Sequence, residues 1–446
     1  MQNTLQKVSV IGLGKLGATM AACFAARGMQ TIGMDSNPQN VEAIRNNIAP
    51  IAETGLQELM NSFAPGRLQA TLNLEEACLE SEISFIIVPT PSEPDGGFSL
   101  QYVLQVCDTM GKALKNKEAF HLLVLTSTVM PGSTGGPICQ LLEQTSGKRC
   151  GEGFGLCYSP EFIALGSIIH DFLNPDFFLI GESDPRSGTM LESFYQKVAE
   201  NNAPVARMNF VNAELTKLAI NTFVTMKITF ANMLTHLCEK LPGGDVDIVT
   251  SAVGMDRRIG KKYLKGALGY GGPCFPRDNL ALSMLARQLG VHAPLAETTD
   301  RMNRAEVPRL AALIKQHLPA EGRVGILGLS YKPETGVIEE SQGVLLAQEL
   351  SNDHIPVTVY DPAAMDNSRQ VIEGAVRFAE SVEECIRKSD VVIIMTPWQD
   401  FRNIRPEMMA AQNTSKVLID CWRLLPRAQF ESVVHYIALG VGHFER

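Results

Sequence analysis

The sequence predicts an α/β protein with two doubly wound parallel sheets joined by a long central helix. Three observations lead to this fold class. Short apolar segments rich in β-branched residues alternate with helix-length segments at both ends of the chain. A glycine-rich turn, GLGKLG, follows the first apolar segment. Residues 210–240 contain no Gly or Pro and carry apolar residues at three- and four-residue spacing, which is typical of a long helix.

The length and composition are typical of a globular protein of several domains. The chain has 446 residues, too many for one ordinary core, and we expect domains at 1–203, 204–300 and 301–446. The net charge of −9 excludes a general attraction to nucleic acid or anionic membranes. The sequence contains no CxxC pair and no cluster of histidines, so we expect no metal site. The ten cysteines are scattered, and neither a signal-peptide pattern nor a membrane-length apolar run is present, so we expect reduced thiols in the cytoplasm.

The first sheet is predicted from the order of its elements. Residues 7–14 read KVSVIGLG, a strand that ends in glycines. A helix pattern follows over 16–26 and a second strand over 30–35, which together form a βαβ unit. Further strands are expected at 83–88 and 122–126, with a helix over 100–114 between them. This alternation predicts a parallel sheet with helices on both faces.

The glycines of the first turn predict a dinucleotide site of the Rossmann type. Gly12 permits the tight turn, Gly14 lets the backbone approach a pyrophosphate, and Gly17 allows close helix–strand packing. Asp35 ends the next strand, where its carboxylate accepts hydrogen bonds from ribose hydroxyls and repels a 2′-phosphate, so we expect NAD rather than NADP. A glycine turn without a ligand is the structural alternative. The predicted cofactor-binding residues are Gly12, Leu13, Gly14, Lys15, Leu16, Gly17, Asp35, Pro89, Thr90 and Thr128.

The chain repeats its opening pattern after about residue 320. VSVIGLG (8–14) matches VGILGLS (324–330), IGMDSNP (32–38) matches VTVYDPA (357–363), and ISFIIVPTP (83–91) matches VVIIMTP (391–397). Three matches in the same order predict a second Rossmann-like sheet. The second turn, residues 325–329, lacks the third glycine, so we expect the same fold without a dinucleotide.

The central helix and a later loop are predicted to carry further function. Apolar residues on more than one face of 210–240 favour a linking helix that also forms a dimer interface. Residues 266–282 read GALGYGGPCFPRDNLAL, in which Pro273 and Pro276 stiffen the turn around Cys274. A helix is expected from near Pro276 to Gln288. The positive end of that helix favours the Cys274 thiolate, although a small buried cysteine is the commoner case for such a residue.

Five ordered motifs resemble those of the nucleotide-sugar 6-dehydrogenase family, of the UDP-glucose and GDP-mannose type. The resemblance covers nearly the whole chain. It implies an N-terminal domain that binds NAD, a helical middle domain that carries the nucleophile and forms a homodimer, and a C-terminal domain that binds the nucleotide sugar. The motifs are GLGKLG (12–17), SPEF (159–162) with GSIIHDFLNPD (166–176), ELTKLAIN (214–221), GYGGPCFPRD (269–278) and GLSYKPET (328–335).

The resemblance implies that NAD oxidises the C6 alcohol of the sugar to a carboxylate in two steps. Cys274 attacks the intermediate aldehyde, the thiohemiacetal is oxidised to a thioester, and water hydrolyses the thioester. Glu161 is implied as the base for this water and Thr128, in STVMPG (127–132), as the residue that positions it. Lys217 and Asn221 lie four residues apart, so they share a helix face and are implied to hold the oxyanion.

The same resemblance implies a substrate site with local basic groups. Asp278 is implied to support the active-site water or the lysine. Lys265 and Lys332 are implied to offset the pyrophosphate charge, and the resemblance allows Arg258 to reach across a dimer interface. Arg423, in DCWR (420–423), is a weaker match to a substrate arginine. The implied substrate-binding residues are Glu161, Phe162, Lys217, Asn221, Arg258, Lys265, Tyr270, Gly271, Tyr331, Lys332 and Arg423.

The sequence departs from the family pattern at a few positions. Leu165 stands where the family usually has a second carboxylate, and Asn40 where it often has Arg or Lys. The run TGVIEES (335–341) has Val337 and Glu339 in place of the Asp and Arg of a TxDxRxS pattern. The joint loss of an acid and a base is either a compensated change or the mark of a different substrate or oxidation outcome.

Three functional interpretations therefore stay open at this point. The first is four-electron oxidation of a nucleotide sugar, most simply UDP-glucose to UDP-glucuronate, with GDP-mannose or a UDP-N-acetylhexosamine as alternatives. The second keeps the fold but performs only a two-electron alcohol oxidation. The third is a non-catalytic regulator that binds NAD or a nucleotide sugar. The set of Glu161, Lys217, Asn221, Cys274 and Asp278 argues against the third.

Overall fold

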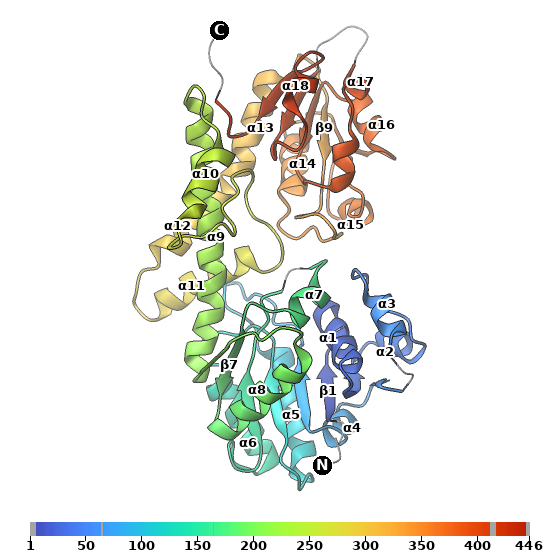
Figure 1. Ribbon diagram of the computed structural model, residues 1–446, viewed down its shortest axis with the longest axis vertical. Helices are drawn as coiled ribbons and strands as arrows, with labels where there is room; N and C mark the ends of the chain where they lie inside the picture. The colour runs from blue at the N-terminus through green and yellow to red at the C-terminus, as the bar shows by residue number, and fades with distance from the viewer. Residues whose placement is uncertain (1–5, 64–65, 164, 411–415, 443–446) are drawn as a thin grey trace. The chain divides into compact units, whose positions relative to one another are not determined.

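The structure is a computed structural model that describes residues 6–63, 66–163, 165–410 and 416–442 (Figure 1). It contains two units, Met1–Ala219 and Ile220–Arg446, each built around one sheet. No helix in these described ranges combines the length and the apolar character that crossing a membrane requires.

The first sheet has the strand order β3-β2-β1-β4-β5-β6-β7-β8. The strands expected from the sequence are present and parallel, which confirms the doubly wound fold. One pair departs from the expected parallel arrangement, because β6 and β7 run antiparallel. The strands are β1 (Lys7–Ile11), β2 (Gln30–Met34), β3 (Leu68–Thr71), β4 (Ile83–Ile86), β5 (Leu122–Leu125), β6 (Gly155–Tyr158), β7 (Phe178–Glu182) and β8 (Val205–Met208).

Helices cover both faces of this sheet. The buried side chains of α1, α7 and α8 form one core layer, and those of α4, α5 and α6 form the other. Phe24 of α1 anchors the first layer, with its ring centroid 4.8 Å from that of Phe85 and 5.0 Å from that of Phe194. The helices are α1 (Lys15–Ala26), α2 (Pro38–Arg45), α3 (Leu56–Asn61), α4 (Leu74–Leu79), α5 (Gln101–Lys115), the π-helical turn η1 (Thr134–Ile138), α6 (Cys139–Ser146), α7 (Ile168–Leu173) and α8 (Pro185–Val198).

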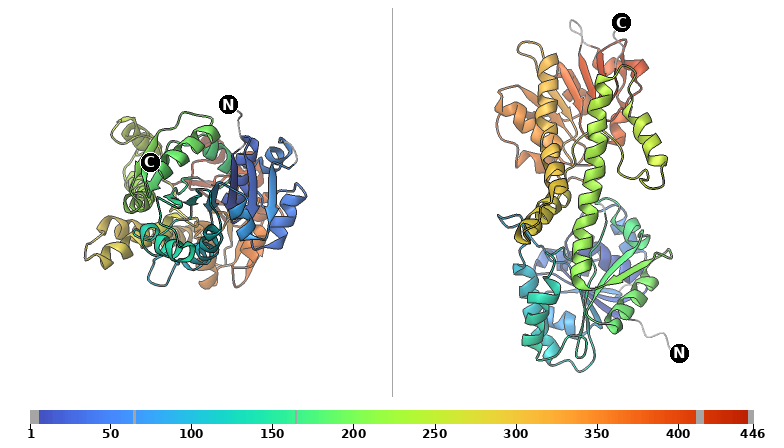
Figure 2. Two further views of the ribbon diagram at one scale, coloured as in Figure 1. Left: turned by 90° about the horizontal axis from the view of Figure 1, so that it is seen from below. Right: turned by 90° about the vertical axis from the view of Figure 1, so that its left-hand side faces the viewer.

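The predicted long helix is α9 (Phe210–Lys240), which is continuous over 31 residues (Figure 2). Its buried positions include polar side chains as well as apolar ones, because Glu214, Thr225 and Thr235 are all fully buried. Buried polar groups must find hydrogen-bond partners, so this helix fixes the loops that supply them. Four helices follow it: α10 (Val246–Met255), α11 (Phe275–Gln288), α12 (Pro294–Arg304) and α13 (Glu306–His317).

The second sheet is fully parallel, with the order β11-β10-β9-β12-β13-β14. This order matches β3-β2-β1-β4-β5-β6 of the first sheet, which confirms the predicted internal repeat. The strands are β9 (Val324–Leu327), β10 (Val357–Tyr360), β11 (Val376–Phe378), β12 (Val391–Ile394), β13 (Val417–Asp420) and β14 (His435–Ala438). The associated helices are α14 (Gln342–Asn352), α15 (Met365–Arg369), α16 (Val382–Arg387), η2 (Gln399–Asn403), α17 (Pro406–Met409) and α18 (Arg427–Phe430).

The repeat extends to the glycine turns of the two sheets. Gly12 N donates to Met34 O at 2.7 Å, and Gly328 N donates to Tyr360 O at 2.8 Å. A Cβ atom on Gly17 would overlap the carbonyl oxygen of Gly12, and one on Gly343 would overlap that of Gly328. The expectation that the second turn lacks its third glycine was therefore wrong. Gly343 fills that role, and an insertion between Gly328 and Gly343 carries the YKPET segment.

The aspartates that end the second strand of each sheet differ in their surroundings. Asp361 is only 1% exposed. Its Oδ2 atom accepts hydrogen bonds from the amides of Leu329 and Ser330 and from Trp398 Nε1, while Oδ1 accepts from two amides of the following turn. Asp35 is half-buried and faces a cavity. In the second sheet the carboxylate is thus used to build the turn and presents no open face to a ribose.

Replacing Asp361 with alanine should destabilise the second unit. The substitution leaves several buried N–H groups without an acceptor, so we expect the free energy of unfolding to fall by about 3 kcal/mol. Urea denaturation followed by circular dichroism measures this change. Asp366→Ala is the matched control, because the Asp366 side chain is 93% exposed and its removal should change stability by less than about 0.5 kcal/mol. Equal midpoints for the two variants would contradict the structural role of Asp361.

Candidate active site

The turn between β1 and α1 opens onto a cavity of about 730 Å³. The first turn of α1 contains no acidic residue, so its amide groups present positive partial charge to the cavity. A Cβ atom on Gly14 would have no neighbour within 4 Å, whereas one on Gly12 would overlap Ile87 O. The backbone at Gly14 is therefore open to a ligand while Gly12 and Gly17 close the turn behind it. This is the arrangement that a pyrophosphate requires.

Most of the predicted cofactor residues line this cavity. Side chains of α4 and α5 also line it, although the pattern of a surface helix gives no local signal of a ligand. Leu13 is fully buried beneath Gly33, and Thr90 donates to Thr128 O at 2.8 Å, so these two support the cavity from behind. The lining residues are Ile11, Gly12, Gly14, Lys15, Leu16, Gly17, Met34, Asp35, Ser36, Asn40, Leu74, Ile87, Val88, Pro89, Tyr102, Gln105, Val106 and Thr109.

Asp35 is held in place at the edge of the cavity. Its Oδ2 atom accepts from Leu13 N at 2.6 Å and from Asn40 Nδ2 at 3.2 Å, and its Oδ1 atom accepts from Asn37 N at 2.7 Å. Asn40, which stands where the family often has a cation, thus orients the carboxylate without adding positive charge. These residues fit the adenosine ribose of NAD and leave a 2′-phosphate facing an unneutralised carboxylate.

The loop of residues 127–134, which we call the Thr128 loop, follows β5 at the carboxyl edge of the sheet. Ser127 Oγ donates to Val88 O at 2.6 Å, and Thr128 O accepts from Thr90. Thr128 is half-buried. The segment that follows β4 therefore holds the start of this loop.

Glu161 follows β6, next to the Thr128 loop in strand order. Part of the residue's surface is accessible, but protein surrounds the carboxyl group. Loss of solvation raises the pKa of Glu161 to about 7, and the nearby Lys217 ammonium opposes this rise. A carboxyl group that titrates near neutral pH is suited to act as a base.

Lys217 of α9 reaches the same loop. Its Nζ atom donates to Glu161 O at 2.6 Å and lies 4.5 Å from the ring centroid of Phe162. Phe162 packs in turn on Phe177, with ring centroids 5.1 Å apart. The structure thus brings Glu161, Phe162 and Lys217 together, all within the first unit.

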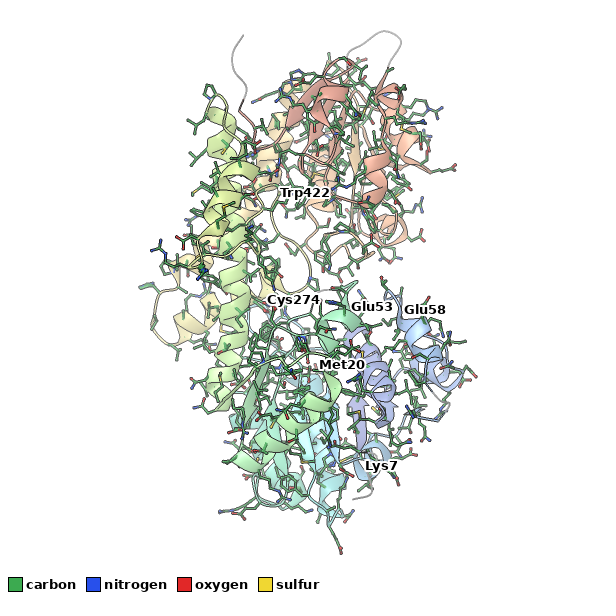
Figure 3. The ribbon with its side chains drawn as sticks, viewed as in Figure 1. Lys7, Met20, Glu53, Glu58, Cys274 and Trp422 are labelled. Carbon is green, nitrogen blue, oxygen red and sulfur yellow. The ribbon has the colours of Figure 1, made fainter. Side chains whose placement is uncertain are left out.

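Cys274 is the N-cap residue of α11 in the second unit (Figure 3). The side chain is exposed, and Cys274 O accepts the helical bond from Asp278 N at 2.9 Å. Gly272 has a positive φ of 87°, and its amide donates to Glu339 O at 2.9 Å. The predicted helix start is confirmed, and the cysteine lies at the positive end of the helix dipole.

Asp278 and Asn221 form a buried pair beside this helix start. Asn221 Nδ2 donates to Asp278 Oδ2 at 2.5 Å, and the two residues are 7% and 2% exposed, respectively. Asp278 therefore contacts the asparagine of the motif on α9. Deeper in the same region, Asn279 bonds with Thr225 Oγ1 and donates to Tyr270 Oη at 2.9 Å.

Two of the predicted substrate residues make several hydrogen bonds within the protein. Tyr270 is 5% exposed, its hydroxyl accepts from Asn279, and its peptide N and O are both bonded to the Asn303 amide. Arg423 uses all five of its N–H groups, on the Asp247 carboxylate and on the carbonyl oxygens of Cys421, Leu439 and Gly266. The Tyr270 hydroxyl thus accepts a hydrogen bond inside the protein, and every N–H group of the Arg423 side chain is bonded within the second unit; as substrate residues, both stay predictions.

The other predicted substrate residues have more open positions. Arg258 is 89% exposed and paired with Asp256 at 2.7 Å, and Lys265 is exposed. Tyr331 packs against residues 266–274, which we call the Cys274 loop. A Cβ atom on Gly272 would lie 2.7 Å from its ring, and Gly271 is buried at the same contact. Lys332 Nζ lies 6.0 Å from the centroid of the Tyr331 ring. These residues all belong to the second unit.

Two of the positions that depart from the family pattern, Val337 and Glu339, lie near this contact, whereas Leu165 lies in the first unit. Val337 is 5% exposed, and its carbonyl accepts from Tyr331 N at 3.0 Å. Glu339 is exposed and meets the Cys274 loop through its main-chain oxygen. Leu165 is half-buried in the first unit, between the Glu161 segment and α7.

Comparison with known proteins assigns the chain to a family over most of its length. Three domain descriptions of the UDP-glucose/GDP-mannose dehydrogenase family match it: the NAD-binding domain at residues 6–199, the central domain at 211–305 and the UDP-binding domain at 325–427.

Individual relatives agree with this assignment. UDP-glucose 6-dehydrogenase AglM of Haloferax volcanii is 34% identical, over 96% of this chain and 100% of the relative. GDP-mannose 6-dehydrogenase of Azotobacter vinelandii is 36% identical, over 94% of this chain and 97% of the relative. The structure of a UDP-glucose dehydrogenase from Pyrobaculum islandicum superposes with a TM-score of 0.88 at 34% identity, over 99% of both chains. The chain is an NAD-binding enzyme and belongs to the UDP-glucose/GDP-mannose dehydrogenase family.

Proposed function

We propose that this enzyme oxidises the C6 primary alcohol of a nucleotide sugar to a carboxylate, with UDP-glucose as the simplest substrate and UDP-glucuronate as the product. The observation that carries the proposal is the exposed Cys274 at the N-terminus of α11, backed by the buried Asp278–Asn221 pair. A nucleophile in that position suits an oxidation that passes through an aldehyde. The reaction would take place in the cytoplasm, where thiols stay reduced.

The proposed reaction proceeds in balanced steps. Bound NAD supplies the two-electron oxidant for the alcohol and, in a second round, for the thiohemiacetal. Between these rounds the Cys274 sulfur adds to the aldehyde carbon and the carbonyl oxygen takes a proton. After the second oxidation, water attacks the thioester carbon, the carbon–sulfur bond breaks, and the thiol and the carboxylate are released.

The side chains of the site have distinct proposed roles in these steps. Glu161, with its pKa raised to about 7, accepts the proton of the attacking water, which Thr128 positions. Lys217 and Asn221 stabilise the oxyanion that forms at the reacting carbon. Asp278 orients Asn221 through their 2.5 Å hydrogen bond.

Other substrates and a shorter reaction are the alternatives. GDP-mannose is supported by the 36% identity to the Azotobacter vinelandii enzyme, which is similar to the 34% identity to AglM. A UDP-N-acetylhexosamine is a further candidate of the same class. A two-electron oxidation would release an aldehyde and one NADH, and a non-catalytic regulator would release neither. A panel of these nucleotide sugars and UDP-glucose, followed for NADH and by mass spectrometry, separates the proposal from its four alternatives.

Cys274→Ser should abolish formation of the sugar acid. The wild-type enzyme should yield two NADH per acid, whereas the variant should make acid about 10³-fold more slowly because a serine hydroxyl is a far poorer nucleophile at neutral pH. Mass spectrometry of the product and absorbance of NADH measure both quantities. Cys150→Ser, a thiol replacement in the first unit, is the control and should retain acid formation. Acid formation by Cys274→Ser at the wild-type rate would rule out the covalent route.

The hydrolytic step should accelerate as the pH rises through about 7. A base must be ionised to act, and with a pKa of about 7 only roughly one tenth of Glu161 is ionised at pH 6, compared with roughly nine tenths at pH 8. Rapid-quench measurement of thioester decay gives the profile. Glu161→Gln should be about 100-fold slower and should lose this inflection. If the inflection persists in Glu161→Gln, another group provides the base.

We also propose that the enzyme is a homodimer formed through α9. Phe223, Phe230 and Leu237 recur at seven-residue spacing on this helix, and their side chains are 59%, 42% and 52% exposed. Such a contiguous stripe of exposed large apolar residues is typical of a protein–protein interface.

Phe230→Asp should weaken the dimer, because it would bury a charge in an apolar interface. Sedimentation velocity should show a dimer for the wild type and a monomer for the variant at about 10 µM. Val371→Asp changes an apolar residue that is 52% exposed outside the stripe, and it should leave the dimer intact. Identical sedimentation of Phe230→Asp and the wild type would exclude this interface.

A further inference from the structure

The first turns of α9 carry a buried acid for which the reaction above has no role. Glu214 is completely buried. Its Oε2 atom accepts from Gly132 N at 2.6 Å, and its Oε1 atom accepts from Thr134 N at 2.8 Å. Both amides belong to the Thr128 loop, so the two oxygens of one carboxylate hold the distal end of this loop.

The Thr128 loop is consequently fixed at both ends. Its start is bonded to the β4 end through Ser127 Oγ and Thr128 O, and its distal end to α9 through Glu214. The N-terminus of α9 is itself wedged in place. A Cβ atom on Gly135 would lie 3.1 Å from the Phe210 ring, and one on Gly181 would lie 2.9 Å from Ala213 Cβ. The helix therefore provides a rigid reference for the loop.

The same stretch of α9 holds the second loop of the site. Lys217 follows Glu214 by three residues and donates to Glu161 O at 2.6 Å. Residues at this spacing are neighbours on a helix. The loops that follow β5 and β6 are thus both tied to one helical turn, and all of these contacts lie within the first unit.

We propose that Glu214 is a positioning residue, whose carboxylate sets the Thr128 loop in register with Lys217 and Glu161 so that water can attack the thioester. This role rests on the proposed function, since it concerns the hydrolytic step. It assigns no direct contact with substrate to Glu214.

A carboxylate is needed here because two N–H groups converge on one side chain. A glutamine of the same shape would offer one oxygen and one NH₂ group, so one amide of the loop would face a donor. An aspartate would keep both oxygens but would be shorter by one methylene. Burial also raises the pKa of Glu214, against the effect of the hydrogen bonds from Thr134 and Gly132. The hold of Glu214 on the Thr128 loop should therefore weaken when the carboxyl group takes up a proton at acid pH.

Glu214→Gln tests the proposal by separating the water step from cofactor binding. We expect kcat for acid formation to fall about 30-fold and the KM for NAD to change less than about threefold, because the cavity at α1 is not altered. The covalent adduct on Cys274 should accumulate in the quenched variant. Amide hydrogen exchange over residues 127–134 should be faster than in the wild type. Glu214→Asp keeps the charge, so its kcat and its exchange rate should lie between those of the wild type and Glu214→Gln. It replaces the glutamine variant in the test if that variant does not fold.

Glu143→Gln is the matched control. Glu143 lies on α6 in the same unit and also accepts a backbone hydrogen bond, from Cys150 N at 3.0 Å. This bond does not involve the Thr128 loop. Its kcat should stay within about twofold of the wild type. Unchanged exchange in the loop for both Glu214 variants, or a kcat loss in Glu143→Gln as large as in Glu214→Gln, would overturn the positioning role. If the wild-type enzyme formed neither acid nor adduct, the proposed function would be refuted. The hydrogen-exchange measurement would then test only whether Glu214 holds the Thr128 loop in place.

Discussion

The polar groups on the buried face of α9 are the constraint on which the rest of the site depends. Glu214, Lys217, Asn221, Thr225 and Asn232 follow one another at intervals of three, four, four and seven residues, which places them along one side of the helix. A buried polar group without a partner costs about 1–3 kcal/mol, so each of these needs a hydrogen-bond partner from another segment. Within the first unit the partners are the Thr128 loop and Glu161. Within the second they are Asp278, Asn279 and the chain that precedes Cys274.

Asparagine amides give the Cys274 loop its shape. Asn232 accepts from Ala267 N at 2.9 Å and donates to Leu268 O at 2.7 Å, and Asn303 forms the same pair of bonds with Tyr270. Each amide therefore imitates a neighbouring strand. The support from residues 339 and 340 also comes from main-chain atoms, since Gly272 N donates to Glu339 O. Because this bond does not involve the side chain, replacing the family's Arg by Glu at position 339 leaves the loop's backbone support intact.

Local patterns predicted the elements of the fold well, because strands and helices follow from periodicity and glycine placement. The strand that ends just before Asp35 and the helix that begins just after Cys274 are examples. The sequence could not reveal Gly343 as the third glycine, since the length of an insertion hides spatial equivalence. Nor could it reveal the hydrogen bonds of Tyr270 to Asn303 and of Arg423 to Gly266, because these partners lie far away in the sequence. The spacing of Glu214 and Lys217 was a usable signal, but only the fold shows which loops they meet.

The internal Asp361 carboxylate has a consequence for the order of events in catalysis. In the described part of the second sheet, the Asp361 carboxylate accepts hydrogen bonds from its own turn. Asp35, at the equivalent position of the first sheet, faces a cavity. In the proposed reaction, the cavity beside Asp35 would serve both rounds of oxidation, which together remove four electrons. Between the two rounds, NADH would leave the cavity and a second NAD would enter it while the half-oxidised sugar stays bound. In the proposed reaction, the covalent link between Cys274 and the half-oxidised sugar would keep the sugar from diffusing away while the cofactor is exchanged.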